Sequence, residues 1–81
     1  MIITYLINTD NEQPLNFCEG YICGLLSAYE IKEYERDTFA SKYVTYTLIT
    51  DIVRKEKIEE KLIKQKIKYR LGTTKIGLSE D

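Results

Sequence analysis

The stretch that decides the fold lies in the middle of the chain, where residues 42–50 read KYVTYTLIT. Side chains alternate along it, so that Val44, Tyr46 and Leu48 share one face while Tyr43, Thr45 and Thr47 share the other. Because β-branched and aromatic residues favour extended backbone, the segment predicts a strand with one face against a core. A turn-rich segment at residues 37–41 precedes it, which predicts a hairpin with the residues before that turn.

A helix is predicted after this strand, starting at Asp51, which is a good N-cap. Apolar side chains then recur at helical spacing, basic residues follow, and Gly72 is typical of the residue just beyond a helix. The sequence therefore predicts one long helix over residues 51–71. An alternative interpretation ends the helix near Gln65 and makes residues 67–71 an alternating strand.

The N-terminal half predicts one strand and one segment that can be interpreted in two ways. Residues 1–9 are apolar, β-branched or aromatic with no polar period, which is typical of a buried strand. In residues 15–29 the apolar side chains fall within about 100° of arc on a helical wheel, and Gly20 and Gly24 lie opposite them. We predict a helix there, and an extended conformation is the alternative.

The predicted order of elements is strand, helix, strand, strand and helix, with a last short strand at residues 73–78 and a tail at residues 79–81. This order predicts a single α+β domain over residues 1–81, a small antiparallel sheet with two helices that is compatible with a ferredoxin-like βαββα(β) unit. If residues 15–29 are extended, the alternative is a small antiparallel sheet or partial barrel with one long C-terminal helix. A chain of 81 residues has room for one modest core.

Charge is divided unevenly along a chain whose net charge is only −1. Residues 1–53 hold three basic and eight acidic groups, a net charge of −5, whereas residues 54–75 hold nine basic and three acidic groups, a net charge of +6. On the predicted helix, five of the basic side chains fall within about 80° of arc. These five are Arg54, Lys57, Lys61, Lys64 and Lys68.

The basic stripe formed by these five residues is the first candidate partner-binding surface. It suits an acidic protein surface or a phosphate backbone, although the solvated face of a helix has the same pattern. The second candidate surface is acidic and consists of Glu30, Glu33, Glu35 and Asp37. Oppositely charged halves on one small domain also predict self-association, either head to tail or as a homodimer about a two-fold axis.

The composition excludes several classes of enzyme. The chain has no histidine, so neither a Ser-His-Asp nor a Cys-His arrangement can form, and it has no phosphate-binding glycine loop. Cys18 and Cys23 are predicted to be reduced packing residues, since a zinc site needs two more soft ligands. Asp10 ends the first strand, where nucleases built on ferredoxin-like dimers place a metal-binding carboxylate, but we predict a loop residue there. We predict no enzyme, no cofactor and no metal.

Aromatic residues on the strands raise the question of RNA binding, because RNA-binding domains with a βαββαβ order stack bases on aromatics of their central strands. Tyr5 with Tyr43 or Tyr46 would occupy those positions. The basic-glycine-aromatic signature of those domains is absent from the chain. We therefore predict that these tyrosines pack in the sheet.

The sequence predicts a small soluble protein of the cytoplasm that acts by binding. No apolar run approaches the roughly 18–20 residues of a membrane-spanning helix, and no basic leader precedes the first strand. Short chains without catalytic groups are often accessory or inhibitory proteins of phages and mobile elements, including inhibitors of host defence. We expect a non-catalytic regulatory protein with a protein partner and no membrane association. The alternative is a dimeric nucleic-acid-binding regulator that uses the basic stripe.

Overall fold

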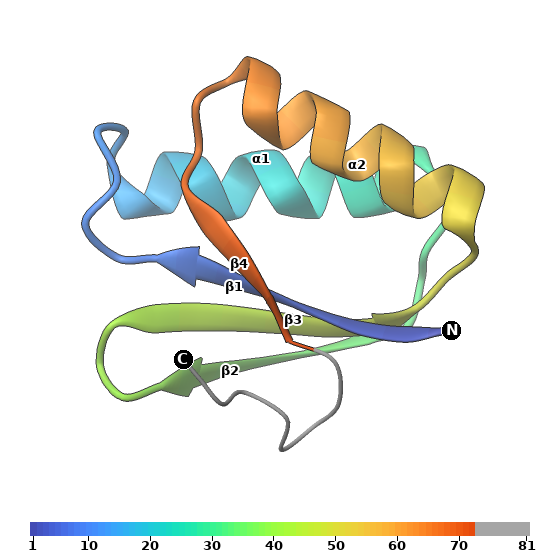
Figure 1. Cartoon of the computed structure of the whole chain (residues 1–81), viewed down its shortest axis with the longest axis horizontal. Helices are drawn as coiled ribbons and strands as arrows, with labels where there is room; N and C mark the ends of the chain where they lie inside the picture. The colour runs from blue at the N-terminus through green and yellow to red at the C-terminus, as the bar shows by residue number, and fades with distance from the viewer. Residues whose placement is uncertain (73–81) are drawn as a thin grey trace.

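The computed structural model describes residues 1–72 and consists of a four-stranded antiparallel sheet with two helices on one of its faces (Figure 1). In chain order the elements are β1 (Ile2–Asn8), α1 (Leu15–Ala28), β2 (Tyr34–Phe39), β3 (Tyr43–Ile49), α2 (Ile52–Lys64) and β4 (Tyr69–Gly72). Across the sheet the strand order is β2-β3-β1-β4. The predicted α+β class is confirmed, and the element order is compatible with a ferredoxin-like unit. The predicted strand at residues 73–78 and the tail at residues 79–81 lie outside the described residues.

The strand predicted from KYVTYTLIT is β3, and its alternation of faces is confirmed. Val44, Tyr46 and Leu48 are buried, and β2 pairs antiparallel with β3, so the predicted hairpin is also present. Ala40 and Ser41 both have positive φ in the turn of this hairpin. The turn is shorter than the predicted segment 37–41, because residues 37–39 belong to β2, and its positive φ values usually go with glycine, asparagine or aspartate.

Both predictions for the N-terminal half are confirmed. β1 lies between β3 and β4, and this central position explains its nearly continuous apolar sequence. α1 is a helix, so the alternative of a partial barrel with one helix is wrong. Its buried side chains are Cys18, Ile22, Leu25 and Leu26. Gly20 and Gly24 lie on its exposed outer face, as the helical wheel predicts.

The prediction of one long helix over residues 51–71 is wrong, because α2 ends at Lys64 and β4 follows. The alternative interpretation, which ends the helix near Gln65 and continues as a strand, is correct. Gly72 is not the residue after a helix but a member of β4, where it lies opposite Thr4 of β1.

α2 ends in a Schellman motif, in which Lys66, with φ 59°, takes the left-handed position that usually belongs to glycine. The Lys66 N–H donates to the Ile63 C=O over 2.9 Å, and the Ile67 N–H donates to the Leu62 C=O over 3.0 Å. Leu62 and Ile67 are both buried, which is typical of the apolar contact in this motif. α1 ends in the same way, with Glu30 at φ 63°.

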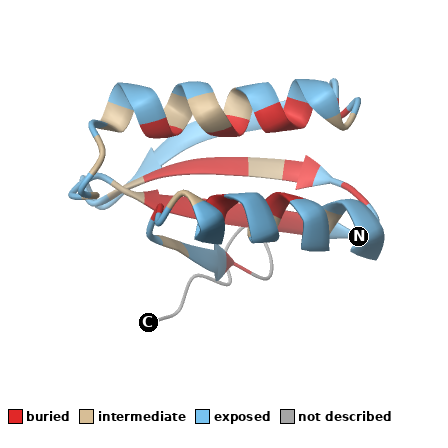
Figure 2. Ribbon diagram, turned by 90° about the horizontal axis from the view of Figure 1, so that it is seen from above, coloured by how far each residue is buried: buried red, intermediate tan, exposed pale blue. Residues whose placement is uncertain are grey.

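The core lies between the sheet and the two helices, and the inward sides of the helices and of the central strands are buried in it (Figure 2). Tyr5 of β1 and Tyr46 of β3 are fully buried there, beneath α2 and α1. The opposite face of the sheet carries neither helix and is called the open face below, although Thr4, Leu6 and Thr45 on it are buried. Side chains at even positions of β1 and odd positions of β3 lie on this open face.

Candidate protein-binding surface

The predicted basic stripe is only partly formed, because α2 is shorter than predicted. The stripe residues on α2 are Arg54, Lys57, Lys61 and Lys64, and all four are exposed. Lys68 lies in the connection to β4, where its C=O accepts a hydrogen bond from the Asn8 N–H over 3.2 Å. The expectation of a five-residue stripe along one helix is therefore wrong.

Arg54 makes contacts within the fold instead of standing free for a partner. Its Nη1 donates to Asp51 Oδ2 over 2.6 Å, and its Nε donates to the Tyr29 C=O over 2.9 Å. Asp51 also caps α2 by accepting from the Arg54 N–H over 2.7 Å, and this hydrogen bond is the main cause that lowers the pKa of Asp51. Arg54 thus joins the end of α1 to the start of α2.

The fold divides the predicted acidic surface into two places. Glu30 follows the end of α1 and Glu33 lies in the connection to β2, so both line the space beside the start of α2. Glu35 and Asp37 belong to β2 and lie on the open face of the sheet. These four residues therefore do not form a single surface.

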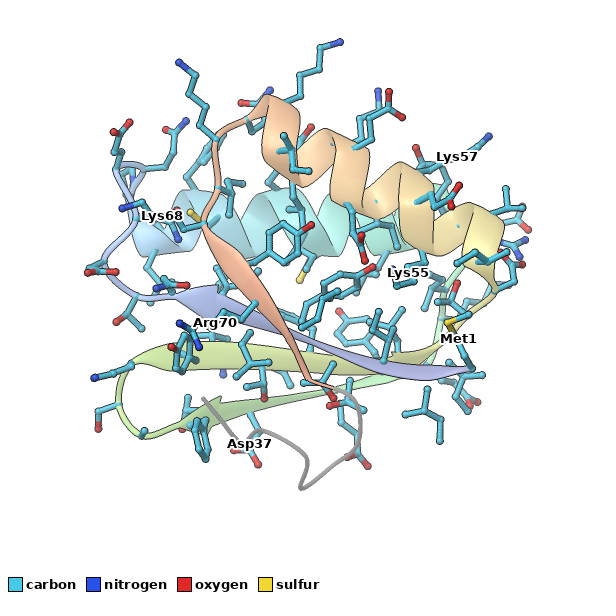
Figure 3. All side chains as sticks on the ribbon, viewed as in Figure 1. Met1, Asp37, Lys55, Lys57, Lys68 and Arg70 are labelled. Carbon is cyan, nitrogen blue, oxygen red and sulfur yellow. The ribbon has the colours of Figure 1, made fainter. Side chains whose placement is uncertain are left out.

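Two adjoining shallow hollows, which share Glu30, Asp51 and Arg54, lie where α1 ends and α2 begins, and together we call them the groove. Its lining includes Glu30 and Glu33 from the acidic surface and Arg54 and Lys57 from the basic stripe. Lys57 extends outward from α2 at this place (Figure 3). The groove is therefore a surface of mixed charge, formed by residues that are distant in the sequence.

Beside this groove lies an apolar patch that sequence reasoning missed. Its members, which we call the end patch, are Met1, Ile2, Ile49, Ile52 and Val53, with exposed fractions between 50% and 71%. The Met1 ammonium donates to the Thr50 C=O over 2.8 Å, and Ile2 lies opposite Ile49 in the sheet. Ile52 and Val53 begin α2, so the end patch lies at the right-hand end of the molecule in Figure 1.

The end patch gathers exposed apolar side chains at one end of the molecule. It holds five of the ten exposed large apolar side chains among the described residues, with Ile2 and Ile49 at the ends of two paired strands and Ile52 and Val53 in the first turn of α2. One signal was present in the sequence: Ile52 and Val53 lie in the first turn of α2, away from its buried residues Ile58 and Leu62. The position of Met1 and Ile2 beside Ile49 could not be predicted without knowing the register of β1 against β3.

A polar cluster joins β2 and β3 to α1 at Glu19. The Glu19 carboxylate accepts hydrogen bonds from Arg36 Nε over 2.6 Å and from the Tyr46 hydroxyl over 2.8 Å. The hydrogen bond from Arg36 is the main cause that lowers the pKa of Glu19, whereas burial raises the pKa of Tyr46. Because it fixes an edge strand onto a helix, we assign the cluster a structural role.

The tyrosines considered for base stacking lie on opposite faces of the sheet. Tyr5 and Tyr46 are fully buried on the helix side, so neither can stack on a base. Tyr43 lies on the open face, where its ring stacks on Phe39 with centroids 6.3 Å apart. Packing in the sheet is therefore confirmed for Tyr5 and Tyr46.

Within residues 1–72, no three His, Cys, Asp or Glu side chains are grouped so that they could hold a metal ion. Asp10, the carboxylate considered for a metal, lies exposed in the turn after β1. Cys18 and Cys23 are free thiols that pack in or against the core, as predicted.

Within residues 1–72, no helix has the length and apolar character needed to cross a membrane.

Comparison with known proteins finds no matching family model, no similar curated protein and no similar solved structure.

Proposed function

We propose that the protein is a small non-catalytic regulatory protein of the cytoplasm that binds a protein partner through the end patch and the adjoining groove. The observation that supports this most is the end patch, whose five apolar side chains are each at least half exposed. Protein interfaces typically have an apolar centre and a polar rim. The groove supplies a charged rim on one side, with Glu30 and Glu33 near Arg54 and Lys57.

The partner surface that fits has an apolar centre and charges of both signs beside it. Such a partner would bury the end patch and pair with the groove, where complementary charge sets orientation more than affinity. A protein of this size that works by covering a partner's surface acts as an inhibitor or accessory factor. An inhibitor of a host defence system, carried by a phage or mobile element, is one such protein.

Replacing Ile49 and Val53 together by serine is expected to weaken partner binding by roughly tenfold or more, because buried apolar anchors dominate interface energies. The matched control is Ile63→Ser, since Ile63 is 64% exposed on α2 but lies outside the end patch. The measurement is quantitative capture of host proteins on immobilised wild type, double variant and control. A partner captured equally by all three proteins would exclude the end patch as its binding site.

Nucleic-acid binding is the second candidate, favoured by the exposed residues Lys57, Lys61 and Lys64 along the outer side of α2. If these three contact duplex phosphates, the logarithm of the binding constant should fall with the logarithm of salt concentration with a slope of about −2.7. Fluorescence anisotropy with mixed-sequence DNA and RNA measures this slope. The variant with all three lysines changed to glutamine should show a shallower slope, and no binding at low salt would rule this candidate out.

A further inference from the structure

The two outer strands of the sheet, β2 and β4, have free edges in the described part of the chain. All six residues of β2 are exposed, and none is proline. A free edge presents unpaired N–H and C=O groups, which makes it a template for another strand. As far as residues 1–72 are concerned, the sheet can therefore be extended at either side.

The hydrogen-bond pattern identifies which residues face these free edges. Met1 and Thr50 exchange backbone hydrogen bonds, so even positions of β3 bond to β1 and odd positions bond to β2. In β2 the residues that bond to β3 are then Glu35, Asp37 and Phe39. The residues of β2 whose backbone groups turn outward are Tyr34, Arg36 and Thr38, and of these groups the Thr38 N–H already donates to Asp37 Oδ1 over 2.8 Å.

The same reasoning applies to the other edge. The Asn8 N–H donates to the Lys68 C=O, so even positions of this segment bond to β1. Tyr69 and Leu71 of β4 therefore turn their backbone groups outward. Each free edge therefore presents outward-facing residues two apart along its strand, three on β2 and two on β4.

The two edges carry opposite charges on the open face of the sheet. On β2 these are Glu35 and Asp37, which lie opposite odd positions of β3. On the other edge they are Lys68 and Arg70, which lie at the positions that pair with Asn8 and Leu6 of β1. Figure 3 shows Asp37 on β2 at one side of the sheet and Lys68 and Arg70 at the segment of β4. Arg70 also interacts within its own chain, so its role here is its positive charge.

We propose that the β2 edge of one molecule pairs with the β4 edge of a second copy and continues the antiparallel sheet from copy to copy. β2 runs parallel to β1 and β4 runs antiparallel to it, so the new pair is antiparallel, like every other pair in the sheet. In the register that places both carboxylates opposite basic residues, Arg36 lies opposite Tyr69 of the second copy and Tyr34 lies opposite Leu71. Between them, Glu35 lies opposite Arg70 and Asp37 opposite Lys68.

Pairing of identical edges is disfavoured by the same charges. Two β2 edges with their outward groups matched would bring Glu35 against Asp37 of the second copy, or one of these carboxylates against itself. Two β4 edges would bring Arg70 against Arg70. Since like charges directly opposite each other destabilise a strand pair, only the head-to-tail pairing is complementary. Head-to-tail contacts form rings or filaments and not closed two-fold dimers.

The helix layer is compatible with this repeat. α1 covers the β2 side of the sheet through Glu19 and Arg36, and α2 covers the β1 side through Glu59 and Tyr5. In a continued sheet, α1 of one copy comes beside α2 of the next. Four strands at about 4.8 Å span about 19 Å, which two helices at about 8–10 Å spacing nearly match.

Sedimentation velocity over a range of protein concentrations tests the proposal. Wild type should show a mass that rises from the 9.5 kDa monomer with concentration and falls when salt is raised. Asp37→Lys and Lys68→Glu should each weaken association by roughly tenfold, because each turns one opposite-charge pair into a like-charge pair. An equimolar mixture of these two variants should associate again, since each reversed edge then meets a complementary one.

The control is Lys57→Glu, which makes the same charge change as Lys68→Glu on α2, away from both edges, and should leave association unchanged. Circular dichroism establishes that each variant is folded. A wild type that stays monomeric at every concentration overturns the proposal, and so does a mixture of folded variants that fails to associate. The proposal is independent of the partner-binding function, because Ile49→Ser with Val53→Ser alters the end patch and neither edge.

Discussion

Replacing Leu62 by alanine is expected to lower the free energy of unfolding by about 2–5 kcal/mol, one of the two largest effects we predict for a single substitution. Leu62 is fully buried in the core and is also the residue of α2 whose C=O accepts from the Ile67 N–H at the end of the helix. Truncation removes apolar contacts and leaves a cavity at the point where the chain turns toward β4. A domain of this size has a stability of only about 5 kcal/mol, so the variant should retain at most about 3 kcal/mol of it.

The neighbouring residue Ile63 provides the matched control, since its side chain is 64% exposed. Ile63→Ala should change the free energy of unfolding by no more than about 0.5 kcal/mol. Urea denaturation followed by circular dichroism compares the two variants directly. Equal losses of stability in both would show that Leu62 is not buried as described.

The end of α2 illustrates why part of the fold could not be predicted from the sequence. Residues 65–71 satisfy local helix rules, because basic side chains suit a helix C-terminus and Gly72 suits the position after it. The interactions that decide against a helix are not local. Tyr69 lies opposite Ile7 of β1, and the Asn11 side chain accepts from the Lys68 N–H. The spacing of Leu62 and Ile67, which fits a Schellman contact, was the available local signal.

The strands and their faces were predictable, because the alternation in β3 and the apolar run in β1 each lie within a single strand. The first pattern fits a strand with one buried face, and the second fits a central strand. The candidate surface was less predictable. Charge counting correctly separated an acidic half from a basic half, but it placed Lys68 on a helix and joined Glu30 to Asp37 in one surface. The end patch combines residues from three elements, and their proximity follows from the register of β1 with β3. Without that register, Ile2 and Ile49 are simply the ends of two strands.

The contribution of Glu19 to stability should depend on pH. The hydrogen bond from Arg36 to its carboxylate lowers the pKa of Glu19 in the folded protein below the ordinary value of 4.5. The carboxylate therefore stabilises the fold fully above pH 4.5. That contribution is lost as the pH falls below 4.5 and through the folded pKa, because the folded state resists protonation more than the unfolded state does. Asp51 adds to the same acid sensitivity from an ordinary value of 3.8, mainly through the hydrogen bond from the Arg54 N–H.

Glu19→Gln should lower the free energy of unfolding at pH 7 by about 1–2 kcal/mol, because the Tyr46 hydroxyl and Arg36 both lose a charged acceptor. The difference from wild type should shrink as the pH is lowered from 5 to about 3, since wild-type Glu19 is then protonated as well. Urea denaturation at a series of pH values measures both quantities, with Glu33→Gln as a control that changes an exposed glutamate near the groove. If wild type and Glu19→Gln lose stability in parallel as the pH falls, the carboxylate of Glu19 is not the group that fixes β2 onto α1.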